Sequence, residues 1–191
     1  MNTQNKINGA TKPRVSKTDW LNAALDVLRE SGIEAVRVER LADKLNVSKS
    51  GFYYHFNGRA DLSAALLEHW KQLDAVPMSQ MRNWGGASPV DVLQKVVETV
   101  SLYDLSGLDM AIRNWAATDP DVKKVYRKEA KQRVAHIRRI FESMGFVGDD
   151  LEMRVHTFVG YTTTERLVFS DMKPRERARL WKLRMELLTQ P

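Results

Sequence analysis

Five residues between positions 49 and 55 could bind phosphate groups and nucleobases. They combine a cation, hydroxyls and flat rings in one short stretch: Lys49, Ser50, Tyr53, Tyr54 and His55. Such groups bind phosphate oxygens and the edges or methyl groups of bases in a DNA major groove. Gly51 lies among them, although glycine inside a helix costs about 1 kcal/mol relative to alanine. We interpret Gly51 as a point of close approach to another surface.

Arg59 follows Asn57 and Gly58 and should stand at the start of the next helix. The free N–H groups and the dipole at a helix N-terminus also favour an anion. Phosphate is therefore the group that this whole stretch is expected to bind.

Two short helices are predicted to position these side chains. Apolar residues in 38–45 recur at helical spacing, and 46–47 reads as a tight turn. Ser48 is expected to cap the following helix, in which Phe52 and Phe56 face inward. Two helices joined by so short a turn form a helix-turn-helix.

The alternative for each residue is ordinary structure. Tyr53 and Tyr54 would then be core residues, and Lys49 and Arg59 would be solvated charges. For any single residue this alternative is favoured. For the combination we favour DNA contact, because composition, spacing and capping agree.

The rest of the chain is also predicted to be helical, which gives an all-α fold. Ser16 and Asp19 resemble a capping box, and the first helix should end at Ser31–Gly32. Further helices are expected over 89–102, 107–117, 120–144, 150–170 and 174–188. Ser88–Pro89 and Asp119–Pro120 are each a capping residue followed by proline at the first helical position. No segment alternates with period two, so no sheet is expected.

Composition excludes several classes of protein. The 191 residues hold no cysteine, which rules out disulfides, thiol nucleophiles and cysteine-ligated zinc. No apolar stretch is long enough to span a membrane and no secretory signal is seen, so a cytoplasmic protein is expected. Common catalytic motifs are absent and the four histidines are scattered, so no enzyme, metal site or cofactor is predicted. Residues 1–60 hold ten basic and six acidic side chains, or +4 of the net +6.

The segment 31–62, SGIEAVRVERLADKLNVSKSGFYYHFNGRADL, resembles the DNA-binding signature of the TetR/AcrR family. The resemblance implies a three-helix reading head, a fourth helix leading into a helical effector-binding and dimerisation domain, and repression of an operator relieved by a small molecule. It also implies the residues that contact double-stranded operator DNA: Arg37, Val38, Ser48, Lys49, Ser50, Gly51, Tyr53, Tyr54, His55 and Arg59.

One position departs from the family's pattern. Glu39 stands where the family often has a base-reading arginine, so we expect Arg37 or Arg40 to compensate through phosphates.

The predicted domain organisation is a flexible arm over 1–15, a helix-turn-helix domain over 16–62, and an effector-binding and dimerisation domain over 63–191. The segment 77–88 is the best boundary marker.

The C-terminal half predicts a ligand site without naming a ligand. The aromatic residues expected to line it are Tyr103, Trp115, Phe158 and Tyr161. A small apolar or aromatic effector would bind between Tyr103 and Tyr161. Core packing explains each of these aromatics equally well. Apolar residues in 150–188 also predict a homodimer through the last two helices. The competing function is a helical protein-binding adaptor without DNA specificity.

Overall fold

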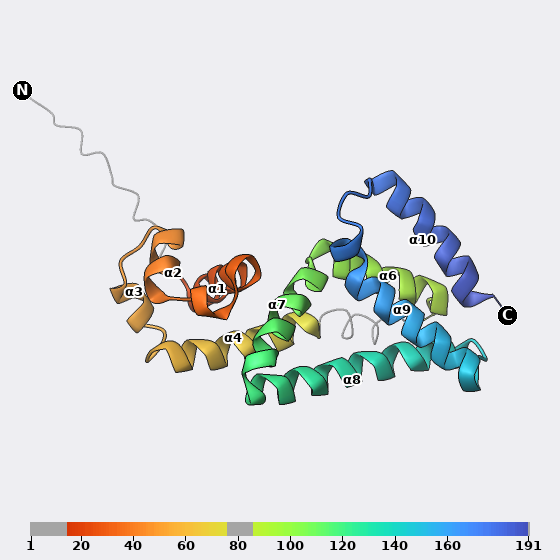
Figure 1. The fold of residues 1–191 in the computed structure, drawn as a ribbon, viewed down its shortest axis with the longest axis horizontal. Coiled ribbons are helices and arrows are strands. Elements are labelled where there is room, and N and C mark those ends of the chain that lie inside the picture. Colours follow the sequence, from red (N-terminus) through yellow and green to blue (C-terminus); the bar gives the residue numbers. More distant parts are fainter. Residues whose placement is uncertain (1–14, 76–85, 191) are drawn as a thin grey trace, which may run out of the picture.

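The computed structural model describes residues 15–75 and 86–190, and these residues are helical with no strand. The arm predicted over 1–15 lies outside the described residues, except for Val15. Most of the predicted boundary segment, 77–88, also lies outside them. Figure 1 shows an elongated molecule with a small helical head at one end and a larger helical body at the other. The all-α expectation is confirmed.

The head consists of α1 (Lys17–Ser31), a short 3₁₀ turn (Ile33–Ala35), α2 (Val38–Leu45) and α3 (Ser50–Tyr53). α1 begins as predicted: the Ser16 hydroxyl accepts from the Asp19 N–H at 3.2 Å, and an Asp19 carboxylate oxygen accepts from the Ser16 N–H at 2.8 Å. α1 ends at Gly32, whose φ of 78° lies in the region that favours glycine.

The long α4 (Arg59–Asp74) leads from the head toward the body (Figure 1). The body contains α6 (Pro89–Leu102), α7 (Leu105–Thr118), α8 (Pro120–Ser143), α9 (Gly148–Val168) and α10 (Pro174–Thr189). The predicted helices are found within two residues of these bounds. Ser88 and Asp119 each cap the following helix through their side chains, with proline at its first position.

Two hydrophobic cores hold the fold together. The first is the head core, which joins α1 to α4 with α7 and the start of α8; its members include Trp20, Phe52 and Trp70, and from α7 Ile112 and Trp115. The second lies between α6, the end of α8, α9 and α10. Because α7 packs on α1 and also on α8 and α9, it connects the head to the body.

Candidate DNA interface and ligand cavity

Two phenylalanines fix the orientation of α3. Phe52 and Phe56 are fully buried, their ring centroids are 5.0 Å apart, and the Phe52 ring meets Trp20 of α1 edge-on at 5.6 Å. With this face of α3 buried, Tyr53 and Tyr54 are left 62% and 67% exposed. The alternative that these tyrosines are core residues is therefore wrong.

The turn before α3 has the expected shape. Asn46 takes the left-handed conformation at φ 52°, and the Val47 N–H donates to the Ala42 carbonyl at 3.0 Å, which closes α2 and redirects the chain. The expected cap at Ser48 is not formed in the described residues. The Ser48 hydroxyl lies 2.7 Å from the Ser50 hydroxyl, and α3 has no side-chain cap.

Gly51 has room for a side chain inside the protein. A Cβ at this position would lie 3.6 Å from Cζ2 of Trp20, an ordinary van der Waals separation, and Gly51 does not have a positive φ. Neither packing within the chain nor backbone conformation therefore explains the glycine.

Two cations of the interface, Lys49 and Arg59, each pair with a carboxylate. Lys49 Nζ lies 2.9 Å from Glu39 Oε1, and Arg59 Nη2 lies 2.9 Å from Glu34 Oε2. The hydrogen bond from Lys49 lowers the pKa of the Glu39 carboxyl, and the same bond raises the pKa of Lys49. All four side chains are more than half exposed, so both pairs are weak and open to exchange with a DNA phosphate.

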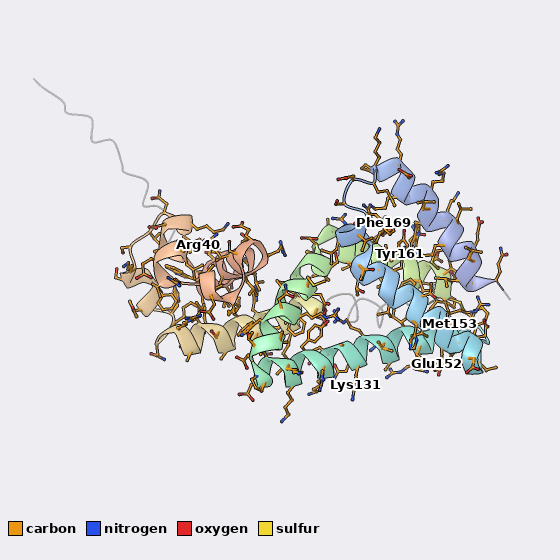
Figure 2. All side chains as sticks on the ribbon, in the orientation of Figure 1. Arg40, Lys131, Glu152, Met153, Tyr161 and Phe169 are labelled. Carbon is orange, nitrogen blue, oxygen red and sulfur yellow. The ribbon has the colours of Figure 1, made fainter. Side chains whose placement is uncertain are left out.

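Several other residues expected at the interface also bond to or pack against the protein. Arg37 precedes α2 and its Nε donates to the Glu34 carbonyl at 3.0 Å, while Val38 packs against the head core. Nε2 of the half-buried His55 lies 3.1 Å from the Val15 carbonyl oxygen. Arg40, expected to compensate for Glu39, donates to the Ser31 hydroxyl at 2.9 Å (labelled in Figure 2).

The body contains a cavity of about 180 Å³ at the end of α4, lined by α4, α6, α7, α8 and α9. Its apolar wall includes Phe158, one of the four aromatics expected there. Trp115 is buried in the head core, and Tyr103 is about half exposed at the end of α6. Neither lines this cavity, and neither does Tyr161.

Tyr161 belongs to a different contact. The Arg184 guanidinium of α10 lies 3.8 Å from the centre of the Tyr161 ring, and Phe169 stacks at 6.4 Å (Figure 2). The sequence predicts Tyr161 as a pocket-lining aromatic, but the guanidinium of Arg184 from the neighbouring helix lies over its ring. Of the four aromatic residues expected around one ligand, Phe158 lines this cavity, whereas Tyr103, Trp115 and Tyr161 do not.

A buried charge cluster forms the polar wall of the cavity. Nη1 of Arg133 donates to Asp74 Oδ1 at 2.8 Å and Nη2 donates to Asp109 Oδ1 at 2.6 Å. The Tyr126 hydroxyl donates to Asp109 Oδ2 at 3.0 Å. These residues come from α4, α7 and α8. We call Asp74, Asp109, Tyr126 and Arg133 the charge cluster.

Burial is the largest cause of the pKa shifts of Asp74 and Tyr126. It raises the pKa of Asp74 to about 6, although the nearby Arg133 guanidinium acts in the opposite direction. Burial and the Asp109 carboxylate raise the pKa of Tyr126 to about 12. Sequence reasoning missed the cluster. The available signal was Asp109, a charged residue between Leu108 and Ile112 on an apolar helix face.

Apolar side chains remain exposed on α9, on α10 and in the segment between them. They are Met153, Leu167, Val168, Phe169, Leu183 and Leu187, of which Figure 2 labels Met153 and Phe169.

The described residues hold no group of three or more side chains able to bind a metal. None of their helices is long and apolar enough to cross a membrane.

A three-helix head with a tight turn between α2 and α3, carried by an all-helical body, is the architecture of a helix-turn-helix regulator. Residues 21–66 match the family model described as bacterial regulatory proteins, tetR family. A curated relative, the uncharacterized HTH-type transcriptional regulator TtgW of Pseudomonas putida, is 28% identical over 79 residues. That match covers 39% of this chain and 59% of the relative, less than two thirds of its length.

Solved structures share the fold over nearly the whole chain. A transcriptional regulator from Rhodococcus sp. has a TM-score of 0.70 at 18% identity, covering 91% of this chain and 96% of its own. A TetR/AcrR-type regulator from Aquifex aeolicus has a TM-score of 0.66 at 19% identity, with 90% and 96% covered. FadR from Bacillus subtilis, solved with stearoyl-CoA, has a TM-score of 0.64 at 16% identity, with 92% and 98% covered. Residues 21–66 thus carry the helix-turn-helix of the tetR family, and the chain shares the fold of these transcriptional regulators over nearly its whole length.

Proposed function

We propose that this regulator is a homodimeric repressor that binds a palindromic operator through α3 and leaves it when a small molecule fills the cavity. The observation that carries the DNA part is the orientation of α3. With Phe52 and Phe56 buried, Lys49, Tyr53 and Tyr54 are presented outward. An exposed helix of this kind suits the major groove.

Within this interface we assign different tasks to different residues. Lys49 reads a guanine edge, while Arg59 at the start of α4 and the Tyr53 hydroxyl hold phosphates. The remaining expected contacts act through close approach or further phosphate bonds: Arg37, Val38, Ser48, Ser50, Gly51, Tyr54 and His55. Arg59 and Lys49 would exchange Glu34 and Glu39 for DNA groups, which costs little because both ion pairs are exposed.

The dimer is proposed to form through the exposed apolar residues of α9 and α10. A two-fold dimer matches the symmetry of a palindromic operator, whose half-sites lie about 34 Å apart. α10 is tied to α9 by the Arg154 guanidinium, which donates to the Leu188 carbonyl at 2.8 Å, and by an ion pair of 3.2 Å between Arg177 and Glu165. These bonds leave Leu183 and Leu187 exposed and available to a partner.

The position of the cavity supports effector control. Asp74, the last residue of α4, lines it, and α4 begins at Arg59 in the proposed interface. An effector that fits one position of α4 better than another would shift the population of DNA-competent dimers, by no more than its difference in affinity for the two forms. FadR, which shares the fold, was solved with stearoyl-CoA, a precedent for a small-molecule ligand in this fold.

Selection of bound genomic fragments, followed by a gel shift of the selected fragment against a scrambled copy, tests this function. We expect a retarded complex with the selected fragment at protein concentrations that leave the scrambled copy free. The alternative, a helical adaptor that binds proteins only, predicts no sequence-dependent shift.

A further inference from the structure

The charge cluster carries an uncompensated negative charge. At neutral pH, Asp74 and Asp109 contribute two negative charges and Arg133 one positive charge, and Tyr126 is neutral. The side chains are largely buried, with exposures of 7%, 12% and 19% for Asp74, Asp109 and Arg133. Two further charged groups act on the cluster, Glu129 on Asp74 and Arg113 on Tyr126, and they are of opposite sign. The buried cluster is therefore net negative, and the second cation of the cavity lining, Arg113, is an exposed residue.

The guanidinium of Arg133 is already committed. Its two Nη atoms bind Asp74 and Asp109 at 2.8 and 2.6 Å, which is the arrangement that a ligand carboxylate or phosphate would need for itself. An anionic ligand that binds Arg133 would have to displace these carboxylates and leave them buried without a partner, which is strongly unfavourable. A ligand cation can bind without displacing Arg133, because each carboxylate can accept about four hydrogen bonds.

A second observation points to a ligand at this wall. Ser106 lines the cavity, is 3% exposed, and its hydroxyl has no hydrogen-bond partner among the described residues. The hydroxyl of Thr162, another lining residue, is also buried without a partner there. Buried polar atoms are normally satisfied, so these two hydroxyls are available to a polar group of a ligand that enters the cavity.

The remaining wall is apolar and the cavity is small. Val96, Val100, Ile137 and Phe158 contribute to it. A cavity of about 180 Å³ is close in size to the roughly 150 Å³ engineered cavity that holds benzene. One ring with a short polar arm fits this space.

On the basis of the proposed effector function, we propose that the cavity binds a small apolar molecule carrying a protonated amine. The ammonium lies at Asp74 and Asp109, and the ring packs against Phe158 and its apolar neighbours. Because Asp74 ends α4, an ammonium that draws this carboxylate away from Arg133 acts directly on the helix that leads to the DNA-binding head.

Three probes with the same ring and different charge test this ligand class on the full chain. They are 2-phenylethylamine, 2-phenylethanol and phenylacetate, compared by calorimetry at pH 7.5. We expect the amine to bind at least about tenfold more tightly than the alcohol, as suits hydrogen bonds between charged groups, and phenylacetate to bind more weakly than the alcohol. Equal affinities, a preference for phenylacetate, or no binding of the amine at millimolar concentration would overturn the proposal.

Variants locate the binding and separate it from DNA release. Asp109→Asn should remove the preference for the amine over the alcohol, while Asp121→Asn, an exposed position outside the cavity, should retain it. If Asp109→Asn does not fold, the three wild-type affinities still decide. Fluorescence anisotropy of labelled operator DNA in the same samples tests release separately: amine binding without loss of DNA affinity contradicts the effector function and leaves the ligand class standing.

Discussion

Lys49 Nζ lies 2.9 Å from Glu39 Oε1, so the cation at the start of the recognition helix is paired with a carboxylate of α2 when no DNA is bound. Glu39 is the residue at which the sequence departs from the TetR/AcrR pattern. In a DNA complex, Glu39 either loses its ion pair with Lys49 or approaches the DNA together with Lys49. Either event reduces the electrostatic gain of binding.

Glu39→Gln should strengthen binding to operator and to scrambled DNA alike, because it removes a negative charge from a surface that faces phosphates. The measurement is anisotropy at several salt concentrations. Glu68→Gln on α4, which breaks the comparable exposed pair with Lys71, is the matched control and should change little. Unchanged affinity in Glu39→Gln would mean that α2 does not face the DNA.

Gly51→Ala separates folding from DNA binding. The Cβ fits beside Trp20 at 3.6 Å, so the variant should fold and gain up to about 0.5–1 kcal/mol in free energy of unfolding from the better helix former. Operator affinity should fall if the glycine allows close approach of α3 to DNA. Urea denaturation and gel shifts measure the two effects, and a variant that binds operator as well as wild type would refute the close approach.

Asp74→Asn should change the pH dependence of stability. Near pH 4 and below, the carboxyl is increasingly protonated in the folded and the unfolded chain; well above pH 6 it is ionised in both, and the folded chain alone bears the cost of a buried charge. The stability of wild type relative to Asp74→Asn should therefore fall by about 3 kcal/mol as pH rises from about 3 to about 7. Urea denaturation at each pH gives the free energy of unfolding of both proteins. A difference between them that does not change across this pH range would show that burial does not raise the pKa of Asp74.

Leu187→Asp should yield a folded monomer, because it puts a charge into the proposed dimer face at a position that is 78% exposed within one chain. Sedimentation at micromolar concentration measures the change, and circular dichroism checks the fold. Val90→Asp on α6, also exposed, should stay dimeric. A wild-type monomer at that concentration would contradict the dimer directly.

Local rules were sufficient to predict most of the fold. Capping by Ser16, Ser88 and Asp119 marks helix starts within a few residues, and the four-residue spacing of Phe52 and Phe56 predicts which face of α3 is buried. These signals depend on neighbours in the sequence, so no tertiary information is needed to detect them.

The charge cluster and the lining of the cavity could not be predicted in this way. Asp74 and Arg133 are 59 positions apart and meet only because α4 and α8 cross in the folded chain. Likewise, the cover that Arg184 provides for Tyr161 depends on where α10 packs. Periodicity identifies the buried face of a helix, but it does not identify the helix that packs against that face.

The central claim is that α3 and the start of α4 form the DNA surface, with Lys49 reading bases and Arg59 holding a phosphate. Affinities for operator and scrambled DNA at several salt concentrations, for wild type, Lys49→Ala and Arg59→Ala, test it most directly. Lys49→Ala should cost about 1–3 kcal/mol per half-site on the operator and relax base preference. Arg59→Ala should weaken both DNAs similarly and flatten the salt dependence by about one unit of slope per site. Operator affinity that is unchanged in both variants at every salt concentration would contradict the account.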